Sequence, residues 1–350
     1  MKIPYPDSDV IGGVNWLSKP MVYFGSLGDV WTCAWADDGE MYAVADDTRG
    51  IHRNAFSNLA VFKVSGSPPS HTVELVNPMA SYGEMCEVQG MDTWKGNGLA
   101  CVDGVLYLAV SQHSGAYDYP DCVQRVADAS IVKSEDHGKT WSAMPELNKP
   151  MFDGPRFATP FFVQFGQDYK DAMDDFVYAI SCGGAWNNGS YMVLGRVPRN
   201  KIASLRAADW EFFQGEDEHG RAKWTADVRK ASGVFKNRNY TSMTGVQYVP
   251  AVKRFIMPQW AYCDPDADNP WAATVLMLFE APKPWGPWRH FHTELNWGRA
   301  SYNPNLPAKW FEEGGKKMWM VSAGDFTMHD QTRADFAYGF TTQKMELRLK

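Results

Sequence analysis

The chain has 350 residues, a net charge of −7 and 45% hydrophobic residues. An acidic chain of this kind lacks the clustered basic charge of a nucleic-acid-binding surface, so we expect no nucleic-acid partner. No stretch of about 18 apolar residues is present, so we expect no membrane span and no membrane partner. The length supports a large hydrophobic core, and nothing in the composition marks a boundary, so we expect one domain over residues 1–350.

The first six residues, Met-Lys-Ile-Pro-Tyr-Pro, lack the apolar segment of a secretory signal peptide. The localisation is therefore open between an intracellular protein and an exported protein whose signal peptide has been removed, and we slightly favour the secreted or periplasmic alternative. The oligomeric state is equally open.

The strongest pattern along the chain is a strand-turn-strand unit that recurs about five times. Its clearest copy joins residues 32–36 to residues 40–47 through the turn Asp-Asp-Gly at 37–39. The later copies join 98–102 to 105–110, 160–165 to 176–180, 244–249 to 254–260, and 306–311 to 317–322. Short apolar segments rich in aromatic and β-branched residues, separated by turn residues, predict β-hairpins.

Each hairpin is followed by one or two further apolar segments. They lie at 58–64 and 72–76, 129–134 and 141–144, 191–197 and 210–213, 274–280 and 288–292, and 335–341. Four strands repeating about every 65–70 residues are typical of a β-propeller. We therefore predict an all-β fold, a five-bladed β-propeller with four-stranded antiparallel blades, in which residues 20–24 complete the last blade. Helical signals are limited to 201–209 and 225–230, and a β-sandwich would not repeat at this length.

Residues 134–141 read Ser-Glu-Asp-His-Gly-Lys-Thr-Trp and match the Asp-box, S-x-D-x-G-x-T-W, of propeller blades. We expect Asp136 to cap a tight turn between a third and a fourth strand, Gly138 to adopt a positive φ, and Trp141 to pack into the blade. Such turns lie on the rim of a propeller, so this motif indicates architecture and not function.

In a propeller, the first strand of each blade starts at the face where the second strand ends, and the loops of that face usually form the ligand-binding mouth. The chain places mainly carboxylates, amides and aromatic rings there, which is typical of a sugar site. The strand starts carry Asp29, Asp92, Asn97, Arg156, Thr159, Tyr240, Ser242, Tyr302 and Asn303, and the strand ends carry Asp46, Asp47, Gln112, His113, Cys182, Gly183, Gln259, Trp260, Tyr262, Gly324 and Asp325. A carbohydrate is the expected partner.

Two carboxylates of the first blade are the predicted catalytic residues. Asp29 opens the inner strand and Asp47 closes the next, so the two should lie side by side in the mouth. One carboxyl group would donate a proton to the leaving oxygen, and the other would act as a nucleophile or activate water, which is the minimal equipment of a glycosidase. Because side chains alternate along a strand, we expect Asp46 to point away from Asp47.

The segment Gly28-Asp29, followed by Asp46-Asp47-Thr48, resembles the first blade of the five-bladed propeller hydrolases of glycoside hydrolase family 183. These enzymes are endo-D-arabinanases that cleave mycobacterial-type arabinan, and both of their catalytic carboxylates belong to this blade. The resemblance implies that Asp29 and Asp47 carry the catalytic roles, in unassigned order, and that the substrate is an arabinan-type glycan.

The other polar and aromatic residues at the mouth are predicted to bind substrate. The amides would contact sugar hydroxyls, and the aromatic rings, together with Trp186 and Trp297, would stack on sugar faces. The predicted substrate-binding residues are His113, Arg156, Gln259, Trp260, Tyr262, Asn303 and Gln112.

Two other functions stay open. His113, with Tyr117 or Tyr119 and with Arg156, would resemble the His/Tyr/Arg sets of propeller polysaccharide lyases, in which Arg neutralises a uronate and His or Tyr removes the C5 proton. A sugar-binding propeller without chemistry would place its carboxylates too far apart to cooperate. A sialidase is less well supported, because that family has six blades and several Asp-boxes.

We expect no cofactor. We also expect no zinc cluster, because the six cysteines contain no CxxC pair. Cys33, Cys101 and Cys182 lie in apolar strands and should be buried thiols, whereas Cys86 and Cys122 are the candidates for a disulfide in an exported protein. A structural Ca²⁺ ion would need oxygen ligands, which the acidic loop 264–268 could supply. We interpret this loop as a solvated loop and not as a metal site.

Overall fold

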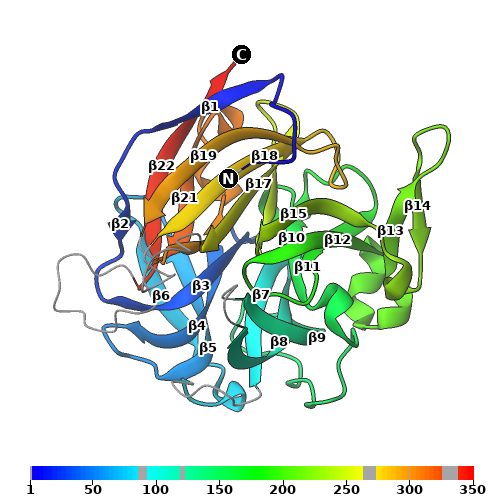
Figure 1. The fold of residues 1–350 in the computed structure, drawn as a ribbon. Coiled ribbons are helices and arrows are strands. Elements are labelled where there is room, and N and C mark those ends of the chain that lie inside the picture. Colours follow the sequence, from blue (N-terminus) through cyan, green and yellow to red (C-terminus); the bar gives the residue numbers. More distant parts are fainter. Residues whose placement is uncertain (1, 86–92, 119–122, 263–272, 299, 325–337) are drawn as a thin grey trace.

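The computed structural model describes residues 2–85, 93–118, 123–262, 273–298, 300–324 and 338–350, and the side chains of residues 114–118 are left out. Antiparallel sheets radiate from a central axis (Figure 1), and the predicted all-β, five-bladed propeller is confirmed. The predicted sites at Cys86, Cys122, Asp92, Tyr117, Tyr119, the loop 264–268 and Asp325 lie outside the described residues or side chains.

Each blade begins at the axis and continues outward. Blade 1 contains β3 (Ser26–Trp35), β4 (Met41–Ile51), β5 (Ser57–Ser65) and β6 (Thr72–Asn77). Blade 2 contains β7 (Thr93–Val102), β8 (Val105–Asp118) and β9 (Val123–Ser134). Blade 3 contains β10 (Thr159–Gln164), β11 (Phe176–Cys182) and β12 (Gly189–Pro198), which pairs with β13 (Glu211–Glu216) and with β15 (Gly233–Thr241), while β14 (Ala222–Thr225) extends β13. Blade 4 contains β16 (Val246–Val249), β17 (Arg254–Tyr262), β18 (Thr274–Ala281) and β19 (Arg289–Gly298). Blade 5 contains β20 (Tyr302–Asn305), β21 (Lys317–Ala323), β22 (Thr341–Leu349) and β1 (Ile11–Trp16).

The predicted closing strand of the ring was placed too far along the chain. The outer strand of blade 5 is β1, whereas β2 (Met21–Val22), within the predicted segment 20–24, forms only a short pair with β22. Ser8, just before β1, donates a hydrogen bond from Oγ to Glu280 Oε1 of blade 4 at 2.8 Å. The first residues of the chain therefore join the last blade and its neighbour, and so close the ring.

Two further details differ from the sequence-based expectation. Blade 2 has three strands in the described residues, because residues 141–144 form no strand. The predicted turn at 134–141 is nonetheless capped as expected: Thr140 N donates to Asp136 Oδ1 at 2.8 Å, and Gly138 has a φ of 85°. The predicted helices are short 3-10 turns, Arg199–Ser204, Ala207–Asp209 and Val228–Lys230.

The blades pack face to face, so their middle strands are buried on both sides. Every residue of β18 is buried, which explains its continuous apolar sequence. Close to the axis the inner strands of neighbouring blades approach through small residues: a Cβ on Gly98 of β7 would lie 2.5 Å from Phe161 Cα of β10. This close contact fixes where the strand starts of adjacent blades lie relative to one another. No helix in the described residues is long and apolar enough to cross a membrane.

Candidate functional site

The start of β3 and the end of β4 meet as predicted, and the backbone there is strained. Asp29 is the Cα partner of Asp46, and the register shifts on both sides of Asp29. Val30, Trp31 and Asp47 have φ values of 65°, 47° and 39°. Left-handed φ values are unfavourable for residues with a side chain, above all for β-branched Val30, and such strain is concentrated at functional sites.

Contacts from the neighbouring blade hold the strained bulge in place. Asn303 of β20, itself at a φ of 48°, donates a hydrogen bond from Nδ2 to Val30 O at 2.5 Å. Within the bulge, Trp31 Nε1 donates to Gly28 O at 2.7 Å. Blade 5 therefore stabilises the conformation that presents Asp29.

Asp29 is half-buried, with its Oδ1 atom shielded from solvent. Tyr302 of β20 donates a hydrogen bond from Oη to Asp29 Oδ2 at 2.7 Å, and Tyr338 contributes a second phenol group nearby. Burial, with repulsion from the Asp47 charge, raises the pKa of Asp29 to about 6, against the opposing effects of Lys95 and the tyrosines. Asp29 therefore holds a proton more readily than an ordinary aspartic acid.

The Asp47 side chain faces a different environment. Its carboxylate is 24% exposed and forms an ion pair with Nζ of Lys95, the third residue of β7 in blade 2. The Lys95 side chain is only 8% exposed. Asp29 and Asp47 thus lie together at the end of blade 1, and Asp47 is the more accessible member of the adjacent Asp46–Asp47 pair.

Asp46 points into the contact between blades 1 and 2. It is 1% exposed, and its two carboxyl oxygens lie 2.9 and 3.0 Å from the backbone N of Gly96, which donates to both. Burial raises the pKa of Asp46 well above its usual range, although Lys95 opposes this effect. This burial agrees with the prediction that Asp46 is directed away from Asp47. The sequence did not predict that Asp46 belongs to the same cluster of charged groups.

His113 lies near this cluster but is unsuited to carry a proton at neutral pH. It is 6% exposed and makes an edge contact with Trp186, with ring centroids 4.8 Å apart. Burial, and to a smaller extent the Lys95 charge, lowers the pKa of His113 to about 3, so the imidazole is neutral. Gln112, its neighbour on β8, is half-buried.

The other predicted substrate-binding residues are mostly engaged inside the protein. Gln259 and Trp260 are fully buried and bond to Ser242 N at 2.9 Å and to Met243 O at 2.9 Å, respectively. Asn303, also buried, clamps the bulge described above. These three positions support the site from within, which corrects the expectation that they contact substrate directly.

Arg156 and Tyr262 lie at the same end of the propeller and are occupied by neighbours. Arg156 donates to Ala231 O and to Tyr191 Oη (3.4 Å), and its guanidinium lies 5.0 Å from the Tyr191 ring centre. Tyr262 is 8% exposed, and its backbone N donates to Asn188 Oδ1 at 3.0 Å.

Among the described residues, two exposed phenylalanines that the sequence did not single out lie next to the ends of β3 and β4. Phe24, just before β3, is 85% exposed and makes an edge contact with His52. Phe56, just after β4, is 49% exposed and lies 5.9 Å from the Arg49 guanidinium. By contrast, the predicted stacking residues Trp186 and Trp297 are buried. Phe24 and Phe56 thus add exposed aromatic surface beside the ends of β3 and β4.

Lys95 and Tyr338 are the site residues that sequence reasoning missed. Lys95 lies just before the predicted inner strand 98–102, where no sequence pattern marks it as a site residue. Tyr338 is far from Asp29 in the sequence, so no local pattern indicates that the two side chains meet.

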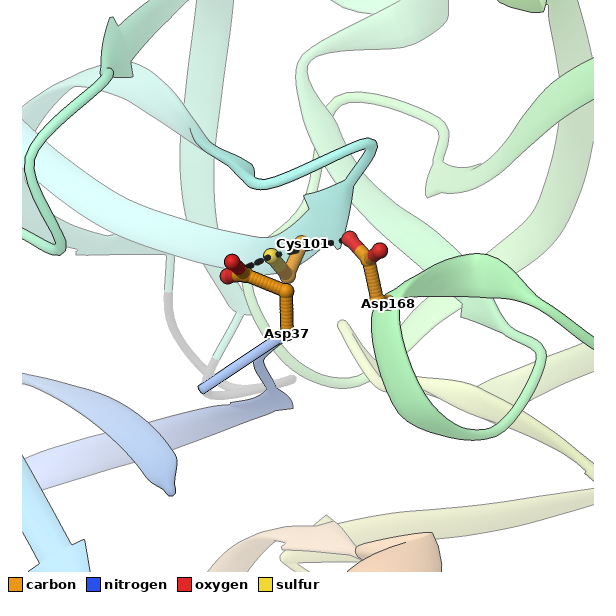
Figure 2. Close-up of side chains that lie close together, drawn as sticks. All are labelled: Asp37, Cys101 and Asp168. Atoms are coloured by element: carbon orange, nitrogen blue, oxygen red, sulfur yellow. Dashed lines mark hydrogen bonds between the residues drawn. The ribbon is translucent and has the colours of Figure 1, made fainter. Parts of the chain in front are cut away.

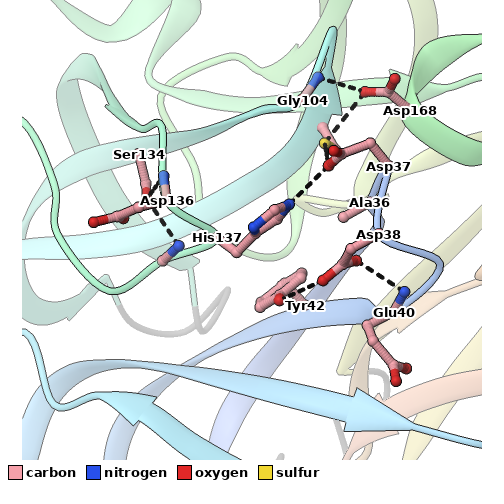
Figure 3. Close-up of polar contacts among 12 residues, drawn as sticks. Ala36, Asp37, Asp38, Glu40, Tyr42, Gly104, Ser134, Asp136, His137 and Asp168 are labelled. Atoms are coloured by element: carbon pink, nitrogen blue, oxygen red, sulfur yellow. Dashed lines mark hydrogen bonds and ion pairs between the residues drawn. The ribbon is translucent and has the colours of Figure 1, made fainter.

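A second polar cluster lies at the opposite end of the propeller. Figure 2 shows Asp37 from the β3–β4 turn, Cys101 from β7 and Asp168 from the β10–β11 connection, whose potential metal ligand atoms lie within 4.8 Å of one another. Their hydrogen bonds are satisfied internally: Asp168 Oδ1 accepts from Gly104 N at 2.8 Å and from Cys101 Sγ at 3.4 Å, and His137 Nε2 lies 2.8 Å from Asp37 Oδ1 (Figure 3).

The chemistry of this second cluster does not fit a metal centre. Burial raises the pKa of the Cys101 thiol, whereas the thiolate is the form that binds metals. A thiol also does not suit Ca²⁺, which prefers oxygen ligands. We interpret the cluster as a contact that joins the turns of blades 1, 2 and 3.

No protein-family model matches the sequence, and no curated protein matches it either. Solved structures do match. A candidate hydrolase from Bacteroides ovatus is 12% identical with a TM-score of 0.56, over 93% of this chain and 86% of the other. An α-L-arabinofuranosidase from Podospora anserina, in complex with cellotriose, is 9% identical with a TM-score of 0.51, over 97% of this chain and 99% of the other.

A GH43_1 enzyme from Xanthomonas citri, complexed with xylose, is 11% identical with a TM-score of 0.50, over 95% of this chain and 90% of the other. The structural neighbours include GH43-type propeller glycoside hydrolases. At these identities the likeness establishes the fold.

The contact between Gly96 and Asp46 generates a stability prediction. A Cβ on residue 96 would lie 2.8 Å from Leu59 Cδ1 and 3.0 Å from Asp46 Oδ1. Gly96→Ala should therefore lower the free energy of unfolding by about 1–3 kcal/mol, measured by denaturant unfolding. Gly12→Ala is the control, because its Cβ would lie no closer than 3.4 Å to any neighbour. Equal unfolding free energies for wild type and Gly96→Ala would contradict the geometry.

Proposed function

We propose that this protein is a glycoside hydrolase that acts on a neutral polysaccharide or oligosaccharide, with Asp29 as the general acid and Asp47 as the nucleophile or general base. The observation that carries the proposal is the pair of adjoining carboxyl groups at the end of blade 1, which lie in different environments. Both residues are half-buried, but Asp29 lies beside two phenols, whereas Asp47 is paired with an ammonium group.

Glycosidases separate the roles of two carboxyl groups through their surroundings. Burial and the Asp47 charge raise the pKa of Asp29 to about 6, so this group can hold the proton that a leaving oxygen needs. Asp47 is in an ion pair with Lys95, and this contact suits a nucleophile or general base. This asymmetry supports Asp29 as the proton donor, in an order of roles that the sequence left open.

The candidate substrate is an arabinan-type glycan. The spacing of Asp29 and Asp47 resembles that of the family 183 endo-D-arabinanases, and the structural neighbours include an arabinofuranosidase. Xylan is the second candidate, because another neighbour is a xylan β-1,4-xylosidase, from Bacillus halodurans. The exposed rings of Phe24 and Phe56 are proposed to stack on sugar units beside the cleavage point.

The charge at the site favours hydrolysis of a neutral glycan over elimination from a uronate. Lys95 is already paired with Asp47 and adjoins the carboxyl groups of Asp29 and Asp46, so it is not available to neutralise the carboxylate of a uronate. Arg156, the residue expected to neutralise a uronate, is bonded to Ala231 and Tyr191. A lyase and a sugar-binding propeller without chemistry are therefore the alternatives that the assay below distinguishes.

The catalytic assignment predicts the effect of two substitutions. Asp29→Asn and Asp47→Asn should each lower kcat by about 10²–10⁴-fold, because each removes a group that handles a proton or attacks the sugar. The measurement is the release of reducing ends from arabinan, xylan and uronate-containing polysaccharides, with ultraviolet absorbance of the products followed in parallel. Asp9→Asn, at an exposed ion pair with Arg289, is the matched control and should act like wild type.

Three results of that assay would contradict the proposal. Near-normal turnover by folded Asp47→Asn would exclude its catalytic role. Ultraviolet-absorbing products from uronate glycans would indicate a lyase, since elimination leaves a C=C bond. Tight binding of a glycan that is never cleaved would indicate a sugar-binding propeller.

The raised pKa of Asp29 predicts the pH dependence of the reaction. The general acid must be protonated, so kcat/KM should fall as the pH rises through the free-enzyme pKa of about 6. The profile of Asp29→Asn should lack this basic limb. A wild-type kcat/KM that stays constant up to about pH 8 would show that Asp29 is not the proton donor.

A further inference from the structure

The Lys95 side chain enters the carboxylate cluster from another blade. It lies near the start of β7, the inner strand of blade 2, while the carboxyl groups belong to β3 and β4 of blade 1. Its side chain is 8% exposed and its Nζ is in contact with Asp47 Oδ1. A buried ammonium group is costly unless it is paired, so this position demands a negative partner.

Two consecutive residues of β7 contact two consecutive residues of β4. The Gly96 backbone N donates to both carboxyl oxygens of Asp46, and Lys95 pairs with Asp47. Asp29, by contrast, accepts a hydrogen bond from the neutral hydroxyl of Tyr302. The positive charge from blade 2 is therefore placed next to Asp47, while Asp29 has a neutral donor.

We propose that Lys95 is a positioning residue that holds Asp47 as a carboxylate and thereby leaves the proton of the pair on Asp29. The mechanism is charge compensation: two carboxylates in one buried site cannot both ionise freely, and the proton stays on the member farther from the cation. This inference rests on the proposed function for the roles of acid and base, but the distribution of the proton is a property of the unliganded protein.

The groups that face Lys95 come from every element around it. They are Asp29 on β3, Asp46 and Asp47 on β4, His113 on β8, and, around Asp29, Tyr302 on β20 and Tyr338. His113 is neutral, because burial and the Lys95 charge lower its pKa to about 3. The cluster thus titrates through its carboxyl groups.

The electrostatics of the cluster agree with the geometry. Burial alone would lower the pKa of Lys95, but the charges of Asp47, Asp46 and Asp29 outweigh burial and raise it. The ammonium group therefore stays charged throughout the pH range in which Asp29 releases its proton.

The test is a titration that needs no substrate. Protein labelled with ¹³C at the aspartate carboxyl carbons is titrated by NMR, with resonances assigned through Asp29→Asn, Asp46→Asn and Asp47→Asn. In wild type, the Asp29 midpoint should lie near pH 6. In Lys95→Met, Asp47 loses the cation that it contacts, so at pH 6 its carboxyl carbon resonance should move from the carboxylate position toward that of a protonated carboxyl group.

Two variants separate charge from packing. Lys95→Arg keeps the cation and should titrate close to wild type. Lys309→Met removes a similarly buried lysine, 12% exposed and paired with Glu40 at 2.6 Å at the opposite end of the propeller. This control should leave the Asp29 midpoint and the Asp47 resonance unchanged. If Lys95→Met does not fold, Asp47→Asn decides: without the neighbouring negative charge, the Asp29 midpoint should fall.

An Asp47 carboxyl resonance at pH 6 that is unchanged in folded Lys95→Met would overturn the role of Lys95, as would an unchanged Asp29 midpoint in Asp47→Asn. The proposed function fails separately, through full turnover in Asp29→Asn or Asp47→Asn while the titrations behave as expected.

Discussion

The buried ammonium group of Lys95, enclosed by Asp29, Asp46 and Asp47, is the interaction on which the rest of the site depends. Each of these groups would be unfavourable alone in a buried environment, and together they compensate one another's charge. The cluster spans the contact between blades 1 and 2, so its geometry is fixed by blade packing and not by one loop. The closely packed inner strands near Gly98 give that contact little freedom.

The propeller also supplies the second requirement of the site, a strained strand start. Val30 and Trp31 adopt left-handed φ values, and Asn303 from blade 5 holds the Val30 carbonyl. Blade 1 therefore provides the carboxyl groups, blade 2 the cation, and blade 5 the clamp and a phenol. Closure of the ring through β1 keeps blade 5 in place, which links the first residues of the chain to the chemistry in its mouth.

The sequence predicted the features that depend on residues close together in the chain. Hairpin patterns and turn residues predicted the propeller, and the alternation of strand starts and ends brought Asp29 and Asp47 together. The sequence did not predict the features that depend on contacts between blades. Gln259 and Trp260 lie at predicted mouth positions but are buried against neighbouring strands. Lys95 precedes the predicted strand 98–102, and its partner Asp47 lies 48 residues earlier in the chain, so only the ring geometry unites them.

The central claim is that a sugar is cleaved between Asp29 and Asp47, and the most direct measurement is a crystal structure of Asp47→Asn with an oligosaccharide that wild type cleaves. The account predicts a glycosidic oxygen within hydrogen-bond distance, about 2.6–3.2 Å, of the Asp29 carboxyl group, with the neighbouring anomeric carbon facing residue 47. A sugar bound at the opposite end of the propeller, or one whose glycosidic oxygens lie out of reach of Asp29, would contradict it.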